Sequence, residues 1–431
     1  MSRLSNVVIR EHLIPRIEGH AEFYVEIDSR NKRVLNVEFR IIEGMRLFEV
    51  AILNRRVDEV PLIVSRICGI CGHAHAICSA IALENAMGVE VHDDINLLRE
   101  IILALNTIES NLLHVTILTA PDMFEVQTIN EISPKVKKLL IECFKIRELA
   151  GKVLGIICGD RIHPRNVVPG GFTYIPSIEK ARYLIEAMYK KSHVLIELLR
   201  SYKEKYLVKL DRVSHYVSLH RDDRYTLLNG DVVIDSRIKI PSNTIRGYIV
   251  ESISKNSTSK TCLLYGTNPY MVGSLARVNN NAYVLVNEIR EVIKDLGLKI
   301  PSTNPFMIPL AQILEVLNLI YMLRDVCEDL KLRQHKVSYN MRKGVGIGVV
   351  EAPRGTLYHS YVCNDYGRVL SVDIVTPTVQ NIADIESSIK IAVQNEISKR
   401  IDLTRIKILC EKIIRCYDPC ISCSVHVIRI R

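Results

Sequence analysis

The sequence contains no tryptophan, and aromatic residues make up only 6% of its 431 residues. It has no run of about 18 or more apolar residues, which a membrane-spanning helix needs. Residues 1–11 carry several charges and lack the apolar stretch of a secretion signal. From these absences we expect a cytoplasmic protein without a transmembrane segment.

The sequence also lacks a concentrated basic patch. Its 57 basic and 48 acidic residues give a net charge of +9, but apart from short clusters the excess is spread along the chain. A nucleic-acid-binding protein usually gathers basic residues on one face, with aromatic residues among them. We therefore expect no nucleic acid partner, and a mildly basic surface that suits an acidic one.

The cysteines are too scattered for a secreted disulfide scaffold, which would be shorter and denser in cysteine. Twelve are present and most stand alone, so we expect reduced thiols. Four of the twelve stand in two close pairs and are the candidates for metal or redox chemistry.

Hydrophobic periodicity predicts β structure first and long helices after it. Apolar and polar residues alternate over 21–42 around a turn at 29–32, which predicts a hairpin. Apolar residues then recur every three or four positions from 95 to 115, and we expect Asp93 and Asp94 to cap this helix.

A second long helix is predicted from Pro134 to residue 153. Further helical patterns cover 178–208, 281–296, 307–332 and 384–415. Short β segments are predicted near 230–250 and 345–375, with irregular glycine- and proline-rich stretches at 163–171 and 344–348.

We therefore predict an α+β fold that is predominantly α, with a long-helix bundle core and small N-terminal and peripheral β segments. No internal repeat, low-complexity tract or clear linker divides the chain. We expect one domain over residues 1–431, with a β-rich part at 1–60 and a helical bundle with inserted β segments at 61–426.

Two C-x-x-C pairs stand near opposite ends of the chain, Cys68/Cys71 and Cys420/Cys423, with 349 positions separating Cys71 from Cys420. Two such pairs can close a tetrathiolate site, which most often holds zinc or an iron–sulfur centre. A structural zinc site usually keeps its pairs within about 15–20 residues. The spacing alone leaves structural zinc, redox disulfides and a catalytic metal open.

The residues around both pairs resemble the signatures of nickel–iron hydrogenase large subunits. The first pair stands in R-I-C-G-I-C-G-H-A-H, from Arg66 to His75, and the second in D-P-C-I-S-C-S-V-H, from Asp418 to His426. Other segments are similar to family motifs along nearly the whole chain: R-I-E-G-H at 16–20, R-L-F-E at 46–49, where the family has R-G-F-E, E-A-P-R-G at 351–355 and T-P-T at 376–378.

This resemblance implies a two-metal centre. All four cysteines would bind nickel, with Cys68 and Cys420 as terminal ligands. Cys71 and Cys423 would also bridge to an iron that carries carbon monoxide and cyanide. Soft thiolate ligands suit such metals, and metal binding keeps the thiols deprotonated.

The resemblance also implies heterolytic cleavage of dihydrogen, with Cys420 taking the proton and Glu18 relaying it outward. A raised carboxyl pKa would suit that relay. Arg354 would lie over the open metal position, oriented by Asp418. Alternatively, Glu18 would form an ion pair with Arg16 or another base, Arg354 would be an ordinary loop arginine, and Asp418 would be a turn residue.

Further residues would surround the metals. His75 would bond to a bridging sulfur, although a lone histidine is more often structural. Pro353 and Thr378 would line the diatomic ligands. His73, His114 and Cys78 are interpreted as packing or surface residues. Ser110 takes a place where some relatives carry an acid.

A second site for magnesium or iron is implied at Glu49 and His426, with the backbone carbonyl of Ile374 as a weaker candidate. His426 also marks where the family is cut by a maturation protease, so residues 427–431 form a candidate cleaved extension. The resemblance also implies a maturation protease and nickel-insertion factors as partners.

Electrons must leave the site, but the remaining cysteines form no cluster for an iron–sulfur centre. The glycines at 344, 346 and 348 do not have the spacing of a dinucleotide-binding loop. The hypothesis therefore requires an iron–sulfur small subunit, with nicotinamide and flavin bound by further flavin/NAD(P) and iron–sulfur subunits.

Residues 266–273, 303–306 and 417–426 resemble the cytosolic, NADP-linked sulfhydrogenase-type branch of the family. A hydrogenase linked to deazaflavin or to a heterodisulfide reductase is an alternative. A metal-free or zinc-bound relative, acting as a structural electron-transfer subunit, is another.

Overall fold

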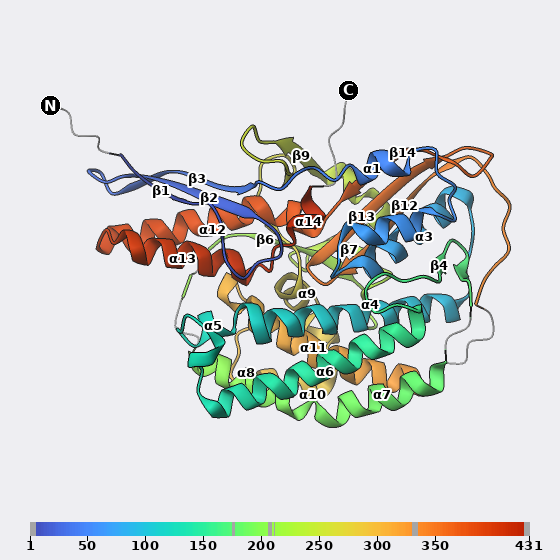
Figure 1. The fold of residues 1–431 in the computed structure, drawn as a ribbon, viewed down its shortest axis with the longest axis horizontal. Coiled ribbons are helices and arrows are strands. Elements are labelled where there is room, and N and C mark those ends of the chain that lie inside the picture. Colours follow the sequence, from blue (N-terminus) through green and yellow to red (C-terminus); the bar gives the residue numbers. More distant parts are fainter. Residues whose placement is uncertain (1–5, 175–176, 206–208, 211, 330–334, 426–431) are drawn as a thin grey trace.

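The computed structural model describes residues 6–174, 177–205, 209–210, 212–329 and 335–425. A layer of long helices forms one half of the molecule, and small sheets with two further long helices form the other (Figure 1). This arrangement confirms the predicted α+β class with a helical bundle and peripheral β segments.

The bundle contains five helices that pack against one another through apolar faces. They are α4 (Asp93–Leu113), α6 (Pro134–Cys158), α7 (Ile178–Lys191), α8 (His193–Lys205) and α11 (Ile308–Asp329). Two stretches, Asp93–Leu118 and Pro305–Cys327, are long and apolar enough to cross a membrane, but 78% and 89% of their most apolar windows are buried inside the molecule. They are therefore core helices here.

Short helices lie at the edges of the bundle and around the sheets. They are α1 (Phe48–Ile52), α2 (Val60–Val64), α5 (Ala120–Met123), α9 (Ser274–Asn281), α10 (Asn287–Asp295) and α14 (Ile421–Ser424). Short stretches of tighter or wider helix occur at η1 (Ser65–Ile67), η2 (His114–Leu118), η3 (Ile129–Glu131), η4 (Ser242–Tyr248), η5 (Ala282–Val284) and η6 (Pro305–Met307).

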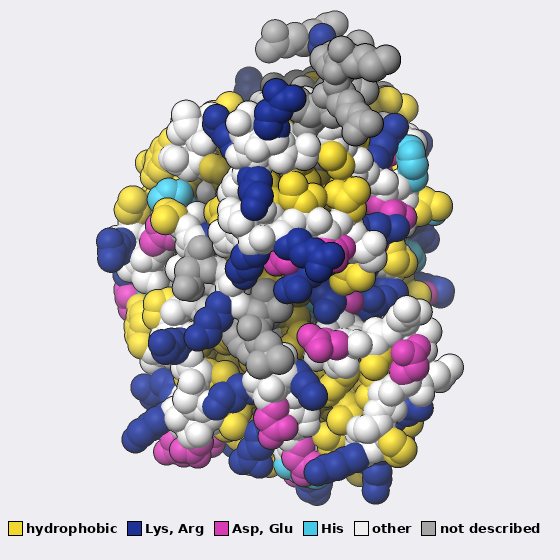
Figure 2. Space-filling model, turned by 90° about the vertical axis from the view of Figure 1, so that its left-hand side faces the viewer, with side chains coloured by type: hydrophobic (Ala, Val, Ile, Leu, Met, Phe, Trp, Pro, Cys, Tyr) yellow, Lys and Arg dark blue, Asp and Glu magenta, His cyan; other side chains and the backbone are white. Residues whose placement is uncertain are grey.

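The first sheet is the antiparallel meander of β1 (Asn6–Glu11), β2 (Ala21–Asp28) and β3 (Arg33–Ile41). The long helix α12 (Pro377–Lys399) packs against β3, and α13 (Leu403–Cys416) packs beside α12 (Figure 1). On the face that carries the ends of α12 and α13, Lys and Arg side chains are spread among acidic and apolar ones (Figure 2). The distribution agrees with a dispersed positive charge.

The second sheet is the antiparallel meander of β12 (Gly344–Ala352), β13 (Gly355–Cys363) and β14 (Val369–Val375). A four-stranded sheet joins β11 (Tyr270–Met271), β6 (His215–His220), β7 (Asp231–Ile234) and β8 (Ile238–Ile240). Two small pairs complete the β structure: β9 (Ile249–Ile253) with β10 (Lys260–Leu264), and β4 (Val167–Val168) with β5 (Gly171–Phe172).

Helix α3 (Gly72–Met87) lies directly on β12 because glycines remove the side chains between the two backbones. A Cβ atom on Gly344, Gly346 or Gly348 would lie 2.0–2.3 Å from a backbone oxygen of α3. Those oxygens belong to residues 86, 82 and 78. Four helical residues rise about 6.0 Å and two strand residues about 6.6 Å, so the two repeats stay in step. We call this contact the glycine ladder.

Three local predictions need correction. Residues 344–348 are not irregular, because they form the start of β12. Asp93 and Asp94 do not cap α4: the N-cap is His92, and both aspartates lie in the first turn, where negative charge favours the helix dipole. The pattern over 384–415 is two helices, since Asp402 caps a new helix by accepting the Arg405 N–H.

Candidate metal centre

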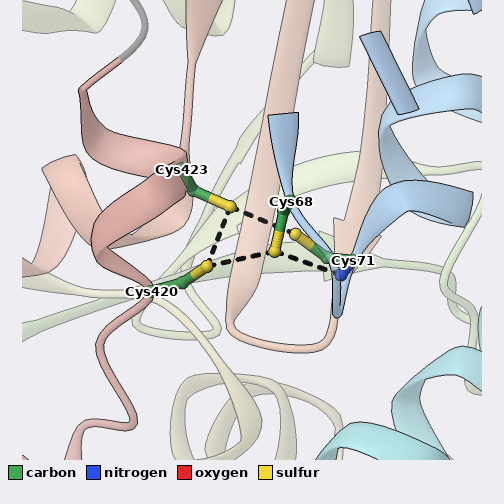
Figure 3. Close-up of side chains that lie close together, drawn as sticks. All are labelled: Cys68, Cys71, Cys420 and Cys423. Carbon is green, nitrogen blue, oxygen red and sulfur yellow. Dashed lines mark hydrogen bonds between the residues drawn. The ribbon is translucent and has the colours of Figure 1, made fainter. Parts of the chain in front are cut away.

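The four paired cysteines meet at one buried point, although the pairs come from opposite ends of the chain (Figure 3). Cys68 follows η1 and Cys71 precedes α3, while Cys420 precedes α14 and Cys423 lies in it. The sulfurs are 3.1 Å apart for Cys68 and Cys420, 3.2 Å for Cys71 and Cys423, and 3.0 Å for Cys420 and Cys423. All four lie within 4.8 Å of one another, and they form the one such cluster found among the described residues.

The geometry fits a metal. A tetrahedral metal with metal–sulfur bonds of about 2.3 Å separates its sulfurs by about 3.8 Å, which lies inside the observed span. Hydrogen bonds from neighbouring thiols, that of Cys420 first, hold the pKa of Cys68 well below its usual range. Burial raises the pKa of Cys420 and Cys423 well above theirs. Without a cation these thiols retain their protons, and a metal that displaces those protons would turn them into ligands.

Backbone groups hold the cysteine loops in place. The amides of Ile70 and Cys71 both donate to the Cys68 sulfur at 3.3 Å, as expected for a thiolate at the start of a turn. The C-terminal segment is held by the N-terminal part of the chain: the Ile421 amide donates to the Glu18 carbonyl at 3.2 Å, and the Arg46 amide donates to the Val425 carbonyl at 2.8 Å.

Arg354 projects towards the sulfurs from the turn between β12 and β13. Residues 352 and 355 pair across this hairpin, so Pro353 and Arg354 are its two turn residues. Arg354 is 6% exposed, and it donates to the Asp418 carboxylate at 2.9 Å and to the Asp418 carbonyl at 2.6 Å. One further Arg354 nitrogen, Nη1, and the Asp418 Oδ2 are buried without a hydrogen-bond partner among the described residues. The predicted pairing of Arg354 with Asp418 is therefore present.

Glu18 lies beside the C-terminal pair and is partly buried. Its carboxylate accepts the Ser422 amide at 3.1 Å. Arg16 turns away to Asp122, at 2.8 Å, and to the Leu118 carbonyl. The alternative of an ion pair between Glu18 and Arg16 is thus not formed.

His75 lies beside the centre with its Nε2 atom 3.8 Å from the Cys423 sulfur. Its other ring nitrogen is 3.1 Å from His359, which in turn is 2.7 Å from the Tyr361 hydroxyl. The sequence motifs predict His75 but neither His359 nor Tyr361. The alternation of these two along β13 is a signal that they share one face of a strand.

Thr378 and Pro353 also reach the site. The Thr378 hydroxyl accepts the Cys420 amide at 2.9 Å, and Thr378 is buried in the first turn of α12. Pro353 lines a small cavity together with Gln312, Arg354, Tyr417 and Asp418.

The second metal site is only partly assembled among the described residues. Glu49 is 8% exposed, and burial raises its pKa to about 8. It accepts the Ile374 amide at 3.0 Å, so Ile374 meets Glu49 through its N–H group, whereas the carbonyl was the expected ligand. His426 lies outside the described residues.

His73, His114 and Cys78 are buried, as a packing role predicts. Burial lowers the pKa of His73 to about 4. The Cys78 thiol donates to the Gly348 carbonyl at 3.2 Å. His114 is hydrogen-bonded to Gln312 at 2.6 Å, and its other ring nitrogen is 4.0 Å from the Asp418 carboxylate.

A cavity of about 270 Å³ with both charged and apolar residues in its lining lies beside the first cysteine pair. It is lined by Gly69, Glu109, Ser110, Arg147 and Arg161, among others. Gly69 is exposed, although Cys68 on one side of it is fully buried and Cys71 is 4% exposed. The Ser110 hydroxyl has no hydrogen-bond partner among the described residues.

Four buried thiols that converge within 4.8 Å of one another form a candidate thiolate-ligated metal centre. The sequence matches the nickel-dependent hydrogenase family over residues 46–143 and 265–426. It is 32% identical to the alpha chain of sulfhydrogenase 1 from Pyrococcus furiosus, over 97% of both chains. It is 27% identical to a chain of the F420-non-reducing hydrogenase vhc from Methanococcus voltae, over 96% of this chain and 94% of that one.

The fold is also that of solved hydrogenases. The crystal structure of an NAD+-reducing [NiFe]-hydrogenase in the H2-reduced state matches with a TM-score of 0.88 and 22% identity, over 97% of this chain and 99% of that one. The chain therefore belongs to the nickel-dependent hydrogenase family. It is the catalytic large subunit of a nickel–iron hydrogenase, an oxidoreductase that acts on dihydrogen.

Proposed function

We propose that Cys68, Cys71, Cys420 and Cys423 hold nickel, and that Cys71 and Cys423 also bridge to an iron with carbon monoxide and cyanide ligands. When bound, this centre would supply the site at which dihydrogen is split into protons and electrons. The convergence of the four sulfurs within 4.8 Å is the observation that carries the proposal.

Glu18 is the proposed proton relay. Its carboxylate is tied to the Ser422 amide, two residues from Cys420, and it is partly exposed. A proton taken by the Cys420 sulfur can therefore pass to a carboxylate that has access to solvent. This order of groups supports an outward route through the N-terminal segment.

Arg354 and Asp418 are proposed to act as a pair at the open side of the metals. The guanidinium is fixed by two hydrogen bonds to Asp418, and its Nη1 atom has no partner among the described residues. A donor that is fixed and desolvated needs no reorganisation when charge develops next to it. His75, at 3.8 Å from the Cys423 sulfur, would hold that bridging ligand in its orientation.

Pro353 and Thr378 are proposed to line the diatomic ligands. Glu49 and His426 are proposed to bind a second cation, magnesium or iron, with Ile374 near it. Bound metal would replace the proton that burial keeps on Glu49. We also propose that the chain acts as one domain, and that maturation removes residues 427–431 after nickel-insertion factors have loaded the site.

Electrons are proposed to leave past Gly69 to an iron–sulfur small subunit. Gly69 is exposed between two buried cysteines, so the wall between the metals and the surface is thin there. The adjoining cavity, with Arg147, Arg161 and Glu109 in its lining, offers a recess for a partner side chain. Further flavin/NAD(P) and iron–sulfur subunits would pass the electrons to NADP in the cytoplasm.

The likeness to a sulfhydrogenase alpha chain supports the sulfhydrogenase-type branch, for which we propose NADP as acceptor. A hydrogenase linked to deazaflavin or to a heterodisulfide reductase is the second candidate. Purified complex supplied with dihydrogen should reduce NADP directly. Reduction of a disulfide substrate, with NADP left unreduced, would favour the second candidate.

Metal analysis and infrared spectroscopy test the centre itself. We expect about one nickel per chain, iron, and infrared absorption from metal-bound carbon monoxide and cyanide. Cys420→Ser should abolish dihydrogen-dependent dye reduction. Cys416→Ser, a change at a buried cysteine outside the cluster, is the matched control and should retain it. Zinc alone in the wild-type protein would instead support a structural role.

A further inference from the structure

We propose that Arg277, on α9, is a positioning residue that fixes Arg354 by holding the backbone of the turn that carries it. The inference rests on the proposed role of Arg354 at the metals. It adds a residue that lies behind the site and touches neither the cysteines nor Asp418 in any described contact.

The contacts between Arg277 and the turn are direct. Its Nη1 atom donates to the Ala352 carbonyl at 3.0 Å, and its Nη2 atom donates to the Pro353 carbonyl at 2.9 Å. These are the two peptide oxygens immediately before Arg354. A guanidinium is planar and offers several donors in a fixed fork, so it can set the orientation of two successive peptides.

The Arg277 guanidinium is itself rigidly anchored. It is fully buried and forms a two-point ion pair with Glu315 of α11, at 2.5 and 2.8 Å. Glu351, at the end of β12, binds it at 2.9 Å. The hydroxyl groups of Ser274 and Tyr225 also donate to Glu315. Arg277 therefore connects Glu315 of the helical bundle to the turn between β12 and β13.

The backbone at Gly273 also lies against this turn. Gly273, the residue before α9, has a φ of 110°, and a Cβ atom there would lie 2.8 Å from the Arg354 carbonyl. The turn is thus held by the Arg277 side chain and lies against the Gly273 backbone. The head of Arg354 is held separately by Asp418, so both ends of that side chain are fixed.

Stability alone is a weak reason for such a cluster. Burying an arginine with two glutamates costs desolvation free energy that the ion pairs only partly repay, and apolar residues often serve as well. Precise placement is a better reason, because a misplacement of about 1 Å near a reacting centre can cost about 100-fold in rate. Arg277 gives the turn such placement.

The test compares Arg277→Lys with Arg99→Lys in the intact complex. Lysine keeps the charge but cannot hold two carbonyls and a two-point ion pair at once. Arg99 is the matched control: it is also fully buried and forms a two-point ion pair, with Glu84 at 2.5 and 2.8 Å. The measurements are nickel content, thermal stability, the infrared bands of metal-bound carbon monoxide and cyanide, and activity per nickel.

We expect Arg277→Lys to retain nickel, to shift the carbon monoxide band, and to lower kcat by about 10- to 100-fold. Arg99→Lys should lose stability to a similar extent, with the wild-type band and activity per nickel. An unshifted band in Arg277→Lys would overturn the proposal, and so would an equal shift in both variants. A wild-type protein without these bands would overturn the proposed function, and this inference with it.

If Arg277→Lys does not fold, Gly273→Ala displaces the same turn at the Arg354 carbonyl, which the new Cβ atom would approach to 2.8 Å. A shifted band with retained nickel in that variant would support the proposal. An unshifted band would overturn it, because Arg354 would then not depend on the position of the turn.

Discussion

Single side chains at the metal centre owe their chemistry to burial and to neighbours that are remote in sequence. The flanking motifs allowed the four cysteines, Glu18, Arg354 and Asp418 to be predicted, because each is read within a short segment. His359 and Tyr361 could not be assigned in this way. His359 contacts His75, and Tyr361 contacts His359, because α3 packs against β13, which no local pattern encodes.

Glu18→Gln should lower the rate of exchange between dihydrogen and solvent protons by about 100-fold or more, because an amide cannot carry the proton. The glutamine oxygen can still accept the Ser422 amide, so nickel content should be unchanged. Isotope exchange followed by mass spectrometry measures the rate. Loss of nickel in this variant would show that Glu18 is structural.

Glu386 should make the chain less stable as the pH rises. Burial raises its pKa to about 7, although its carboxylate accepts the Phe39 amide at 2.9 Å. Between about pH 4.5 and pH 7 the folded state binds more protons than the unfolded state. The contribution of the protonated Glu386 carboxyl to the free energy of unfolding is therefore complete at low pH and is lost as the pH rises through 7.

The expected loss in the free energy of unfolding is at most about 3 kcal/mol. Glu386→Gln keeps an oxygen that can accept the Phe39 amide, and it should remove the part of the pH dependence of stability that comes from Glu386. Urea unfolding of both proteins at pH 5 and pH 8 measures it. Parallel pH profiles would contradict the prediction.

At the scale of elements, periodicity located the helices and sheets, but contacts between backbones decided their details. The stretch at 344–348 is rich in glycine, and it forms a strand because α3 lies against it. The break between α12 and α13 follows from one capping residue, Asp402, inside a continuous apolar pattern. Patterns of side chains do not reveal where a missing side chain lets two backbones touch.

Gly346→Ala tests the glycine ladder. The new methyl group would lie 2.0 Å from the Ala82 carbonyl and 2.1 Å from the Ala86 amide, so helix and strand must separate. We expect a loss of about 1–3 kcal/mol in stability, with lower nickel occupancy because Cys71 precedes α3.

Gly155→Ala, on α6, is the control. Its Cβ atom would meet nothing within 4 Å, so the variant should be as stable as the wild type or more stable. Denaturant unfolding compares the two changes. Equal stability of both variants would mean that the absence of a side chain at Gly346 is not needed for the contact between α3 and β12.

At the scale of the whole molecule, the fold brings together two cysteine pairs that are 349 positions apart in a 431-residue chain, counted from Cys71 to Cys420. The segment at 420–425 lies between Glu18, Arg46 and Thr378, so its hydrogen bonds depend on the body being folded already. The sequence motifs indicated that the ends meet, but not which segments hold them together.

Substitutions at Gly69 test the proposed binding of the iron–sulfur small subunit at this position. Its φ lies outside the left-handed region, and an added Cβ atom would meet nothing within 4 Å, so Gly69→Ala should behave as wild type. Gly69→Gln places a longer side chain where the iron–sulfur partner is proposed to sit. We expect normal nickel content but at least about 10-fold weaker recovery of that partner on co-purification. Full recovery would place the partner elsewhere.

The exposure of Gly69 also has a consequence for inactivation of the protein by oxygen. The centre is shielded from solvent there by little more than the exposed peptide, whereas all four cysteines lie within the packed body. Until another protein covers this spot, dissolved oxygen meets little obstruction. The free polypeptide should therefore inactivate faster than the assembled enzyme, so assembly would give protection as well as a conducting path.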